Sequence, residues 1–90
     1  MKTIEELRDY LITAFPDSRI YLFGSRARGD DTEWSDIDIA LDSPKDLSQK
    51  LAKVRFEIEE SLLPCKVDLI DLRRAPYLKK VVEKEGVRWH

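Results

Sequence analysis

Short apolar segments alternate along this chain with longer segments of helical periodicity, and this alternation limits the possible folds more than any other feature. The apolar segments are bounded by glycine, proline or polar residues, which predicts β-strands at 19–23, 36–41 and 66–72. The longer segments repeat apolar residues every three or four positions, which predicts helices at 3–15, at about 44–63 and from Pro76, with a single helical turn at 25–29. The order α-β-α-β-α-β-α predicts an α/β (α+β) fold, a small mixed or parallel sheet covered by helices, and leaves the strand order open.

Particular residues mark several of these boundaries. Thr3 and Glu6 have the spacing of a capping box, so Thr3 is predicted to be the N-cap of the first helix. Ser43 and Pro44 are predicted to be the N-cap and the first residue of the long helix. That helix is expected to bury one stripe of side chains, namely Leu47, Leu51, Val54, Ile58 and Leu62. Residues 87–90 are expected to form a short edge strand or a loose tail.

Length and charge exclude several classes of protein. With 90 residues the chain is expected to be one domain, 1–90, with a modest core and no room for a second, acceptor-binding domain. The net charge of −2 argues against a broad nucleic-acid footprint, which usually needs a basic surface. The lone Cys65 cannot form an internal disulfide, and no signal-peptide core or membrane-length apolar run is seen. We therefore expect a cytoplasmic protein without membrane or direct nucleic-acid partners.

Two carboxylates lie two positions apart in the predicted strand "DIDIAL". Because strand side chains alternate between faces, Asp36 and Asp38 are expected to point the same way, while Ile37 and Ile39 enter the core. Two like charges on a mostly buried strand are costly unless they are protonated, paired or bound to a cation. With no histidine or cysteine nearby, the ligands are all oxygen, which favours Mg²⁺ or Mn²⁺. The alternative is that both residues only keep a strand end soluble.

A third carboxylate on a neighbouring strand would complete a site for two metal ions. The strand at 66–72 offers Asp68 and Asp71, which fall on opposite faces. Asp68 lies among apolar neighbours, whereas a solvated or capping role is easy for Asp71 at the strand end, so Asp68 is predicted to be the ligand. Gly24 and Ser25 follow the first strand, where glycine lets a phosphate approach the backbone and serine adds a hydroxyl donor.

These residues, in this order, resemble the signature of the DNA polymerase beta-like nucleotidyltransferase superfamily. The matching positions are Gly24-Ser25, Asp36-Ile37-Asp38 and Val67-Asp68-Leu69. The segments "GSRARG" and "SDIDIAL" resemble in particular its minimal nucleotidyltransferases, the MNT proteins. The resemblance implies that Asp36 and Asp38 hold two Mg²⁺ ions that bind a nucleoside triphosphate. It also implies that Asp68 completes one metal site and helps to activate the attacking hydroxyl.

The resemblance further implies a substrate and a partner. Gly24 and Ser25 would contact the triphosphate of ATP, and the products would be a nucleotidylated acceptor and pyrophosphate. MNT proteins are typically encoded beside a small helical HEPN protein. Several such pairs are toxin and antitoxin, in which the MNT protein adds AMP to a tyrosine of the HEPN RNase.

Three further residues have two interpretations each. Arg26 and Arg28 are candidates for steadying a triphosphate, and exposed charges on a helical turn explain them equally well. Trp34, in the predicted polar loop 30–35, is a candidate for stacking on a base or a partner, or for packing over the loop.

Three functions follow from the sequence as hypotheses. The first is Mg-dependent transfer of AMP from ATP to a hydroxyl of a HEPN-type toxin, with this chain as the antitoxin. The second is an antitoxin that acts by binding alone, which would need neither Gly-Ser nor Asp-x-Asp. The third is nucleotidyl transfer to a small molecule such as an aminoglycoside, and the missing acceptor domain counts against it. A HEPN-like gene beside this one would favour the first two.

Overall fold

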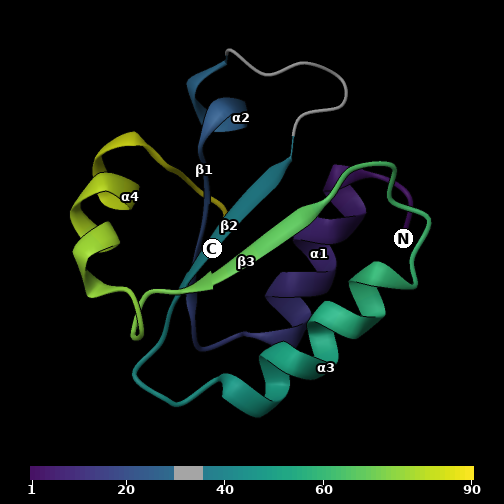
Figure 1. Cartoon of the computed structure of the whole chain (residues 1–90), viewed down its shortest axis with the longest axis horizontal. Helices are drawn as coiled ribbons and strands as arrows, with labels where there is room; N and C mark the ends of the chain where they lie inside the picture. Colours follow the sequence, from purple (N-terminus) through teal and green to yellow (C-terminus); the bar gives the residue numbers. More distant parts are fainter. Residues whose placement is uncertain (30–35) are drawn as a thin grey trace.

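The computed structural model describes residues 1–29 and 36–90, and the predicted polar loop with Trp34 lies outside these described residues. Helices and strands alternate along the chain as the sequence predicts (Figure 1). In chain order the elements are α1 (Ile4–Ala14), β1 (Arg19–Phe23), α2 (Ser25–Arg28), β2 (Ile37–Asp42), α3 (Ser48–Glu59), β3 (Val67–Asp71), the 3-10 helix η1 (Pro76–Leu78), α4 (Lys79–Glu85) and β4 (Val87–Arg88).

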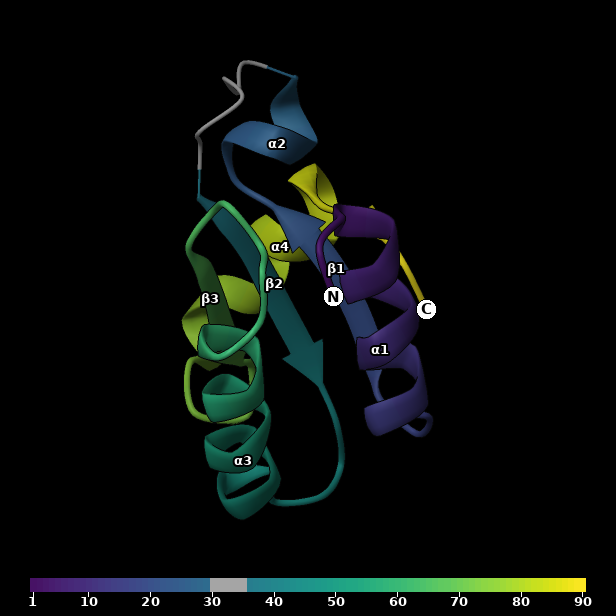
Figure 2. The ribbon, with the colours of Figure 1, turned by 90° about the vertical axis from the view of Figure 1, so that its right-hand side faces the viewer.

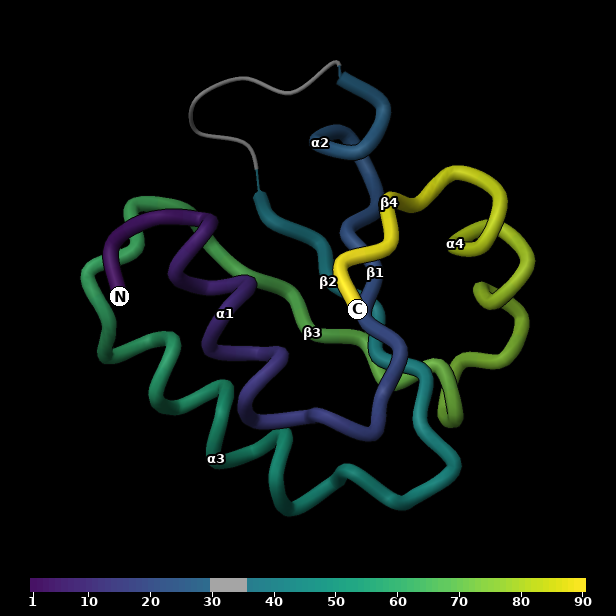
Figure 3. Tube along the Cα trace, turned by 180° about the vertical axis from the view of Figure 1, so that it is seen from behind, coloured from purple at the N-terminus to yellow at the C-terminus, as the bar shows by residue number. Residues whose placement is uncertain are grey.

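The strands form one mixed sheet in the order β3-β2-β1-β4. β1 is antiparallel to both of its neighbours, β2 and β4, whereas β2 and β3 are parallel. The C-terminal segment therefore forms a short edge strand against β1 rather than a loose tail (Figure 3). This arrangement leaves β3 and β4 as the outer strands and confirms the prediction of a small mixed sheet covered by helices.

Helices cover both faces of the sheet (Figure 2). α1 and α3 pack on one face, over the larger core, whose fully buried side chains include Leu7, Leu11, Ile20, Ile39 and Leu41. α4 covers the other face with a smaller cluster of buried side chains, namely Tyr21, Ala40, Leu72 and Val82. Within the described residues no helix has the length and apolar character needed to cross a membrane.

The first helix begins as its sequence predicts. The Oγ1 atom of Thr3 accepts a hydrogen bond from the backbone N–H of Glu6 at 3.1 Å, which satisfies one of the donors left open at a helix start. The hydroxyl of Thr3 also lies 3.4 Å from Oε1 of Glu6, so the two side chains face each other as in a capping box.

The long helix is shorter at both ends than predicted, and the prediction that Ser43 and Pro44 open it is wrong. The Ser43 hydroxyl accepts from the N–H of Lys45, and the Asp46 carboxylate accepts from the N–H of Ser48, so two local turns precede α3. Polar side chains that bond to the backbone two residues on compete with helix formation. The first helical residue is consequently Ser48.

The prediction that Leu62 belongs to the buried stripe is also wrong. α3 ends at Glu59, and the N–H of Leu62 donates to the carbonyl of Met1, so this segment has left the helix. The Leu62 side chain is 70% exposed. Other boundaries differ by one residue, since β2 runs from Ile37 to Asp42 and β3 from Val67 to Asp71. The 3-10 helix η1, which starts at Pro76, precedes α4.

Candidate active site

Asp38 and Asp68 are direct neighbours on adjacent strands. They are register partners in the parallel pair of β2 and β3, so their side chains leave the same face of the sheet. Asp36 directly precedes β2 and is exposed. The structure therefore pairs Asp38 with Asp68 and places Asp36 directly before β2. The start of β2 lies at the end of the sheet near α2 (Figure 1).

Gly24 lies against the carboxylate of Asp38. A Cβ atom at Gly24 would overlap Oδ2 of Asp38 and lie 3.3 Å from its Cγ. Gly24 also has φ of 77°, in the region that L side chains rarely adopt, and its carbonyl accepts hydrogen bonds from the N–H groups of Ala27 and Arg28. Glycine is needed here both for the turn into α2 and for the close approach of Asp38.

The carboxylates act on one another electrostatically. Burial raises the pKa of Asp38 above its ordinary value of 3.8, and the negative charges of Asp68 and Asp36 raise it further. The cationic side chains of Arg28 and Lys66 oppose this rise. The charge of Asp38 is therefore destabilised in the folded chain, and a bound cation would relieve it.

This shift gives the stability of the fold a definite pH dependence. A carboxyl group whose pKa is raised by folding binds its proton more tightly in the folded state. The free energy of unfolding therefore falls as the pH rises from 3.8 through the raised pKa, and it is constant above that pKa. Asp38→Asn removes the titrating group. We expect this variant to be more stable than wild type at pH 7, with the difference shrinking as the pH falls toward 3.8. Urea unfolding of both proteins from pH 3.5 to 7 measures this, and a pH-independent difference would contradict it.

The residues fit a divalent cation by their chemistry but do not form a closed metal site. Within residues 1–29 and 36–90, no three acidic, histidine or cysteine side chains are gathered tightly enough to hold a metal ion. The ammonium of Lys66 lies 3.7 Å from Oδ1 of Asp68 and supplies positive charge beside the carboxylates. Both side chains are partly exposed, so this ion pair contributes at most about 1 kcal/mol. A Mg²⁺ ion could replace it at an all-oxygen set of Asp36, Asp38 and Asp68.

Asp71 lies apart from this site, as its opposite face predicts, but it is not solvated. Its register partner is Leu41, and its side chain is buried, with only 6% exposed. One carboxylate oxygen accepts from the N–H of Arg73 at 3.0 Å, so Asp71 holds the turn that follows β3. The other oxygen, Oδ2, is buried and has no hydrogen-bond partner within the described residues.

The two candidate arginines of α2 point to different neighbours. Nη2 of Arg26 donates to Sγ of Cys65 at 3.3 Å, which ties α2 to the segment that enters β3. Arg28 lies close enough to Asp38 to lower its pKa. Lys66 was missed by the sequence analysis. Its position directly before β3 and two residues before Asp68 is the signal that could have revealed it.

A mixed four-stranded sheet with a Gly-Ser turn beside facing aspartates is the arrangement of a nucleotidyltransferase domain. The family model described as "Nucleotidyltransferase domain" matches residues 4–89, and the chain belongs to this family. It is a nucleotidyltransferase, and the resemblance to the minimal nucleotidyltransferases is confirmed.

Curated relatives carry names that are more specific than the family. The chain is 35% identical to "Putative protein adenylyltransferase MJ1379" of Methanocaldococcus jannaschii, and the match covers 94% of this chain and 96% of that protein. It is 41% identical over 58 residues to "Probable protein adenylyltransferase MntA" of Haemophilus influenzae, which covers 62% of this chain and 50% of that protein. The chain is thus a nucleotidyltransferase similar to proteins that are named protein adenylyltransferases.

Two solved structures that share this fold are of toxin–antitoxin systems. A toxin–antitoxin crystal structure with AMP-PNP has a chain that superposes with a TM-score of 0.73 at 30% identity, covering 92% of this chain and 72% of that one. A mutant MntA-HpeT toxin–antitoxin, with two aspartates two positions apart replaced by glutamates, gives a TM-score of 0.70 at 27% identity over 92% of this chain and 71% of that one. The fold predicted from the sequence is therefore confirmed.

Proposed function

We propose that residues 1–90 form a single minimal nucleotidyltransferase domain that transfers AMP from ATP to a tyrosine hydroxyl of a HEPN-type toxin and so acts as its antitoxin. The proposal is carried by the close arrangement of three residues from neighbouring strands: Gly24 directly after β1, Asp38 on β2 and Asp68 on β3. Gly24 lies against Asp38, and Asp38 faces Asp68 in register.

The relatives support the substrate and the partner. A structural neighbour was crystallised with AMP-PNP, an analogue of ATP, and both toxin–antitoxin neighbours contain a partner toxin. In the mutant neighbour, the altered residues are two aspartates with the same spacing as Asp36 and Asp38. These facts belong to the relatives, and they favour ATP and a protein acceptor for this chain.

The roles of the side chains follow from the chemistry of the transfer. The acceptor oxygen forms a bond to the α-phosphorus of ATP. The bond between that phosphorus and the oxygen that bridges the α- and β-phosphates breaks, and pyrophosphate leaves. Gly24 and Ser25 would hold the triphosphate, and Asp68 would take the proton of the attacking hydroxyl. Two Mg²⁺ ions, held by Asp36, Asp38 and Asp68, would supply stabilisation of negative charge on the attacking and leaving oxygens. Arg28, whose charge acts on Asp38, would add positive charge beside the phosphates.

Ser25→Ala tests the turn formed by Gly24 and Ser25, which is expected to bind the triphosphate and is called the phosphate cradle. Ser25 is half-buried at the start of α2, and its hydroxyl is expected to donate to the triphosphate. Losing one hydrogen bond to a charged group costs about 1.5–3 kcal/mol, so transfer at limiting ATP should slow by about ten- to a hundredfold without loss of folding. Initial rates at low ATP, with circular dichroism as the folding control, measure this. A variant as fast as wild type would remove Ser25 from the site.

The proposal is tested by weighing the partner. The purified protein is mixed with the protein encoded beside it, ATP and Mg²⁺, and the partner is analysed by intact mass spectrometry. One or more AMP-sized additions on a tyrosine are expected. An unmodified partner that is nevertheless bound and silenced would replace the proposal by an antitoxin that acts through binding alone. A parallel reaction replaces the partner by an aminoglycoside. Modification of the aminoglycoside, with an unmodified partner in the first reaction, would favour a small-molecule transferase.

A further inference from the structure

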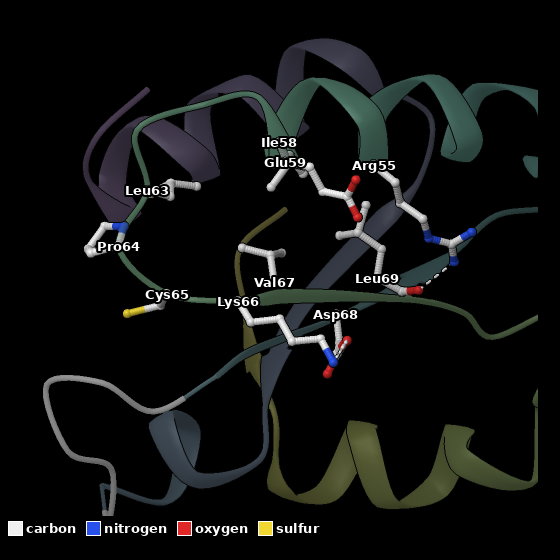
Figure 4. A pocket seen from close by; sticks show the side chains of 10 residues that line it. All are labelled: Arg55, Ile58, Glu59, Leu63, Pro64, Cys65, Lys66, Val67, Asp68 and Leu69. Carbon is white, nitrogen blue, oxygen red and sulfur yellow. Dashed lines mark hydrogen bonds and ion pairs between the residues drawn. The ribbon is translucent and has the colours of Figure 1, made fainter.

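A groove of about 550 Å³ runs between α3 and the outer edge of β3 (Figure 4). Its apolar walls come from Ile58 on α3, from Leu63 and from the strand residues Val67 and Leu69, which point toward α3 (Figure 4). Asp68 lines the same groove from the other face of the strand. The groove therefore joins an apolar surface to a carboxylate of the candidate active site.

The outer edge of β3 offers main-chain groups to this groove. The carbonyl of Lys66 accepts from the N–H of Ile37, and the N–H of Leu72 donates to the carbonyl of Leu41, so residues with even numbers bond to β2. In a parallel ladder the residues between them direct their N–H and C=O groups away from that neighbour. For β3 these residues are Val67, Leu69 and Asp71, of which the first two line the groove. Nη2 of Arg55 donates to the Leu69 carbonyl at 2.7 Å, so α3 covers this part of the edge.

The groove and the phosphate cradle lie on opposite sides of Asp38. Gly24 follows β1, Asp38 is on β2 and Asp68 is on β3, and the sheet order places β2 between the other two. An in-line displacement needs the attacking oxygen and the leaving pyrophosphate on opposite sides of the α-phosphorus. An acceptor in the groove would attack from the side of Asp68, with the triphosphate on the side of Gly24.

We propose that this groove binds the acceptor as an extended polypeptide segment of the partner protein, which pairs with the outer edge of β3 at Val67. Such pairing is a recurrent mode of peptide recognition, in which main-chain hydrogen bonds give affinity and neighbouring pockets select side chains. The ring of the acceptor tyrosine in this segment packs on Ile58 and Leu63, and its hydroxyl reaches Asp68. This inference rests on the proposed function and adds to it where and how the acceptor binds.

The charges of the groove favour a polypeptide over a nucleic acid. Arg55 and Lys66 on its rim are balanced by Glu59 and Asp68. A polyanion needs a surplus of positive charge, whereas a neutral groove with apolar walls and strand-edge donors suits a peptide.

A matched pair of tryptophan variants tests the groove. Glu59 lines it, whereas the adjacent Glu60 is exposed and does not, so Glu59→Trp fills the groove and Glu60→Trp places the same side chain beside it. With the partner protein as acceptor, Glu59→Trp is expected to raise KM for the partner by about tenfold or more, with kcat and the thermal shift caused by Mg²⁺ and ATP unchanged. Glu60→Trp should behave as wild type.

A second variant tests the main-chain contact. Val67→Pro removes an N–H that faces away from β2 and places a ring on the outer edge, a position where strands tolerate proline. It should also raise KM for the partner while the response to Mg²⁺ and ATP persists.

Three outcomes would overturn the inference, and they differ from one another. In the first outcome, wild type transfers AMP and Glu59→Trp has the same KM for the partner as wild type. This result would show that the groove is not the acceptor site and would leave the proposed function intact. An altered oligomeric state of Glu59→Trp in analytical ultracentrifugation, with unchanged KM, would assign the groove to a second copy of this chain. Absence of transfer by wild type would remove the proposed function and the inference with it.

Discussion

Asp38→Asn is expected to lower the rate of AMP transfer by about a hundred- to a thousandfold, the size of effect seen when one electrostatic group of an active site is removed. Asparagine keeps the shape of the side chain and removes the charge that would hold Mg²⁺. The rate of AMP addition to the partner, followed by intact mass spectrometry, measures the loss. Asp36→Asn should lose activity in the same way.

Stability separates this loss from misfolding. Because burial and the neighbouring carboxylates raise the pKa of Asp38, the asparagine variant should be more stable than wild type at pH 7 while it is inactive. Asp9→Asn, at an exposed position on α1, is the matched control and should change neither property. Transfer by Asp38→Asn at the wild-type rate would mean that the site has been assigned to the wrong residues.

Gly24→Ala is expected to have the second-largest effect, on both stability and activity. The new methyl group would overlap Oδ2 of Asp38, and the backbone would keep a positive φ of 77°. A strained backbone costs about 1–3 kcal/mol, and a displacement of a catalytic group by about 1 Å costs about a hundredfold in rate. Urea unfolding and the rate of AMP transfer measure the two effects.

Gly29→Ala provides the control for this experiment. Gly29 has φ of 81°, close to that of Gly24, but no atom of residues 1–29 or 36–90 lies within 4 Å of a Cβ atom placed there. It should lose about 1–2 kcal/mol of stability from the backbone alone and retain its transfer rate. Equal losses of activity in the two variants would show that the contact with Asp38 has no role.

Most elements of the fold could be predicted because local signals agree with the tertiary structure. The capping residue Thr3 and the apolar spacing of Leu7 and Leu11 define α1, and glycine ends β1 after Phe23. The start of α3 could not be predicted, because Ser43 and Asp46 bond to nearby backbone N–H groups and hold turns that a cap-and-proline pattern does not distinguish from a helix start.

The sequence predicts those features of the candidate site that depend only on the alternation of side chains between the two faces of one strand. The choice of Asp68 over Asp71 follows from the faces of one strand, and the register with Asp38 agrees with it. The contact between Gly24 and Asp38, the ion pair of Lys66 and the burial of Asp71 depend on how different strands meet. Sequence spacing carries no information on those distances.

The fate of each phosphate of ATP tests the central claim most directly. The protein and its partner are incubated with Mg²⁺ and ATP labelled either at the α- or at the γ-phosphate, and the label on the partner is measured after gel separation. Transfer of AMP predicts that the α-label stays on the partner, that the γ-label appears in pyrophosphate, and that Asp38→Asn transfers neither. Label from the γ-phosphate on the partner, or no label on a partner that is bound and silenced, would contradict the account.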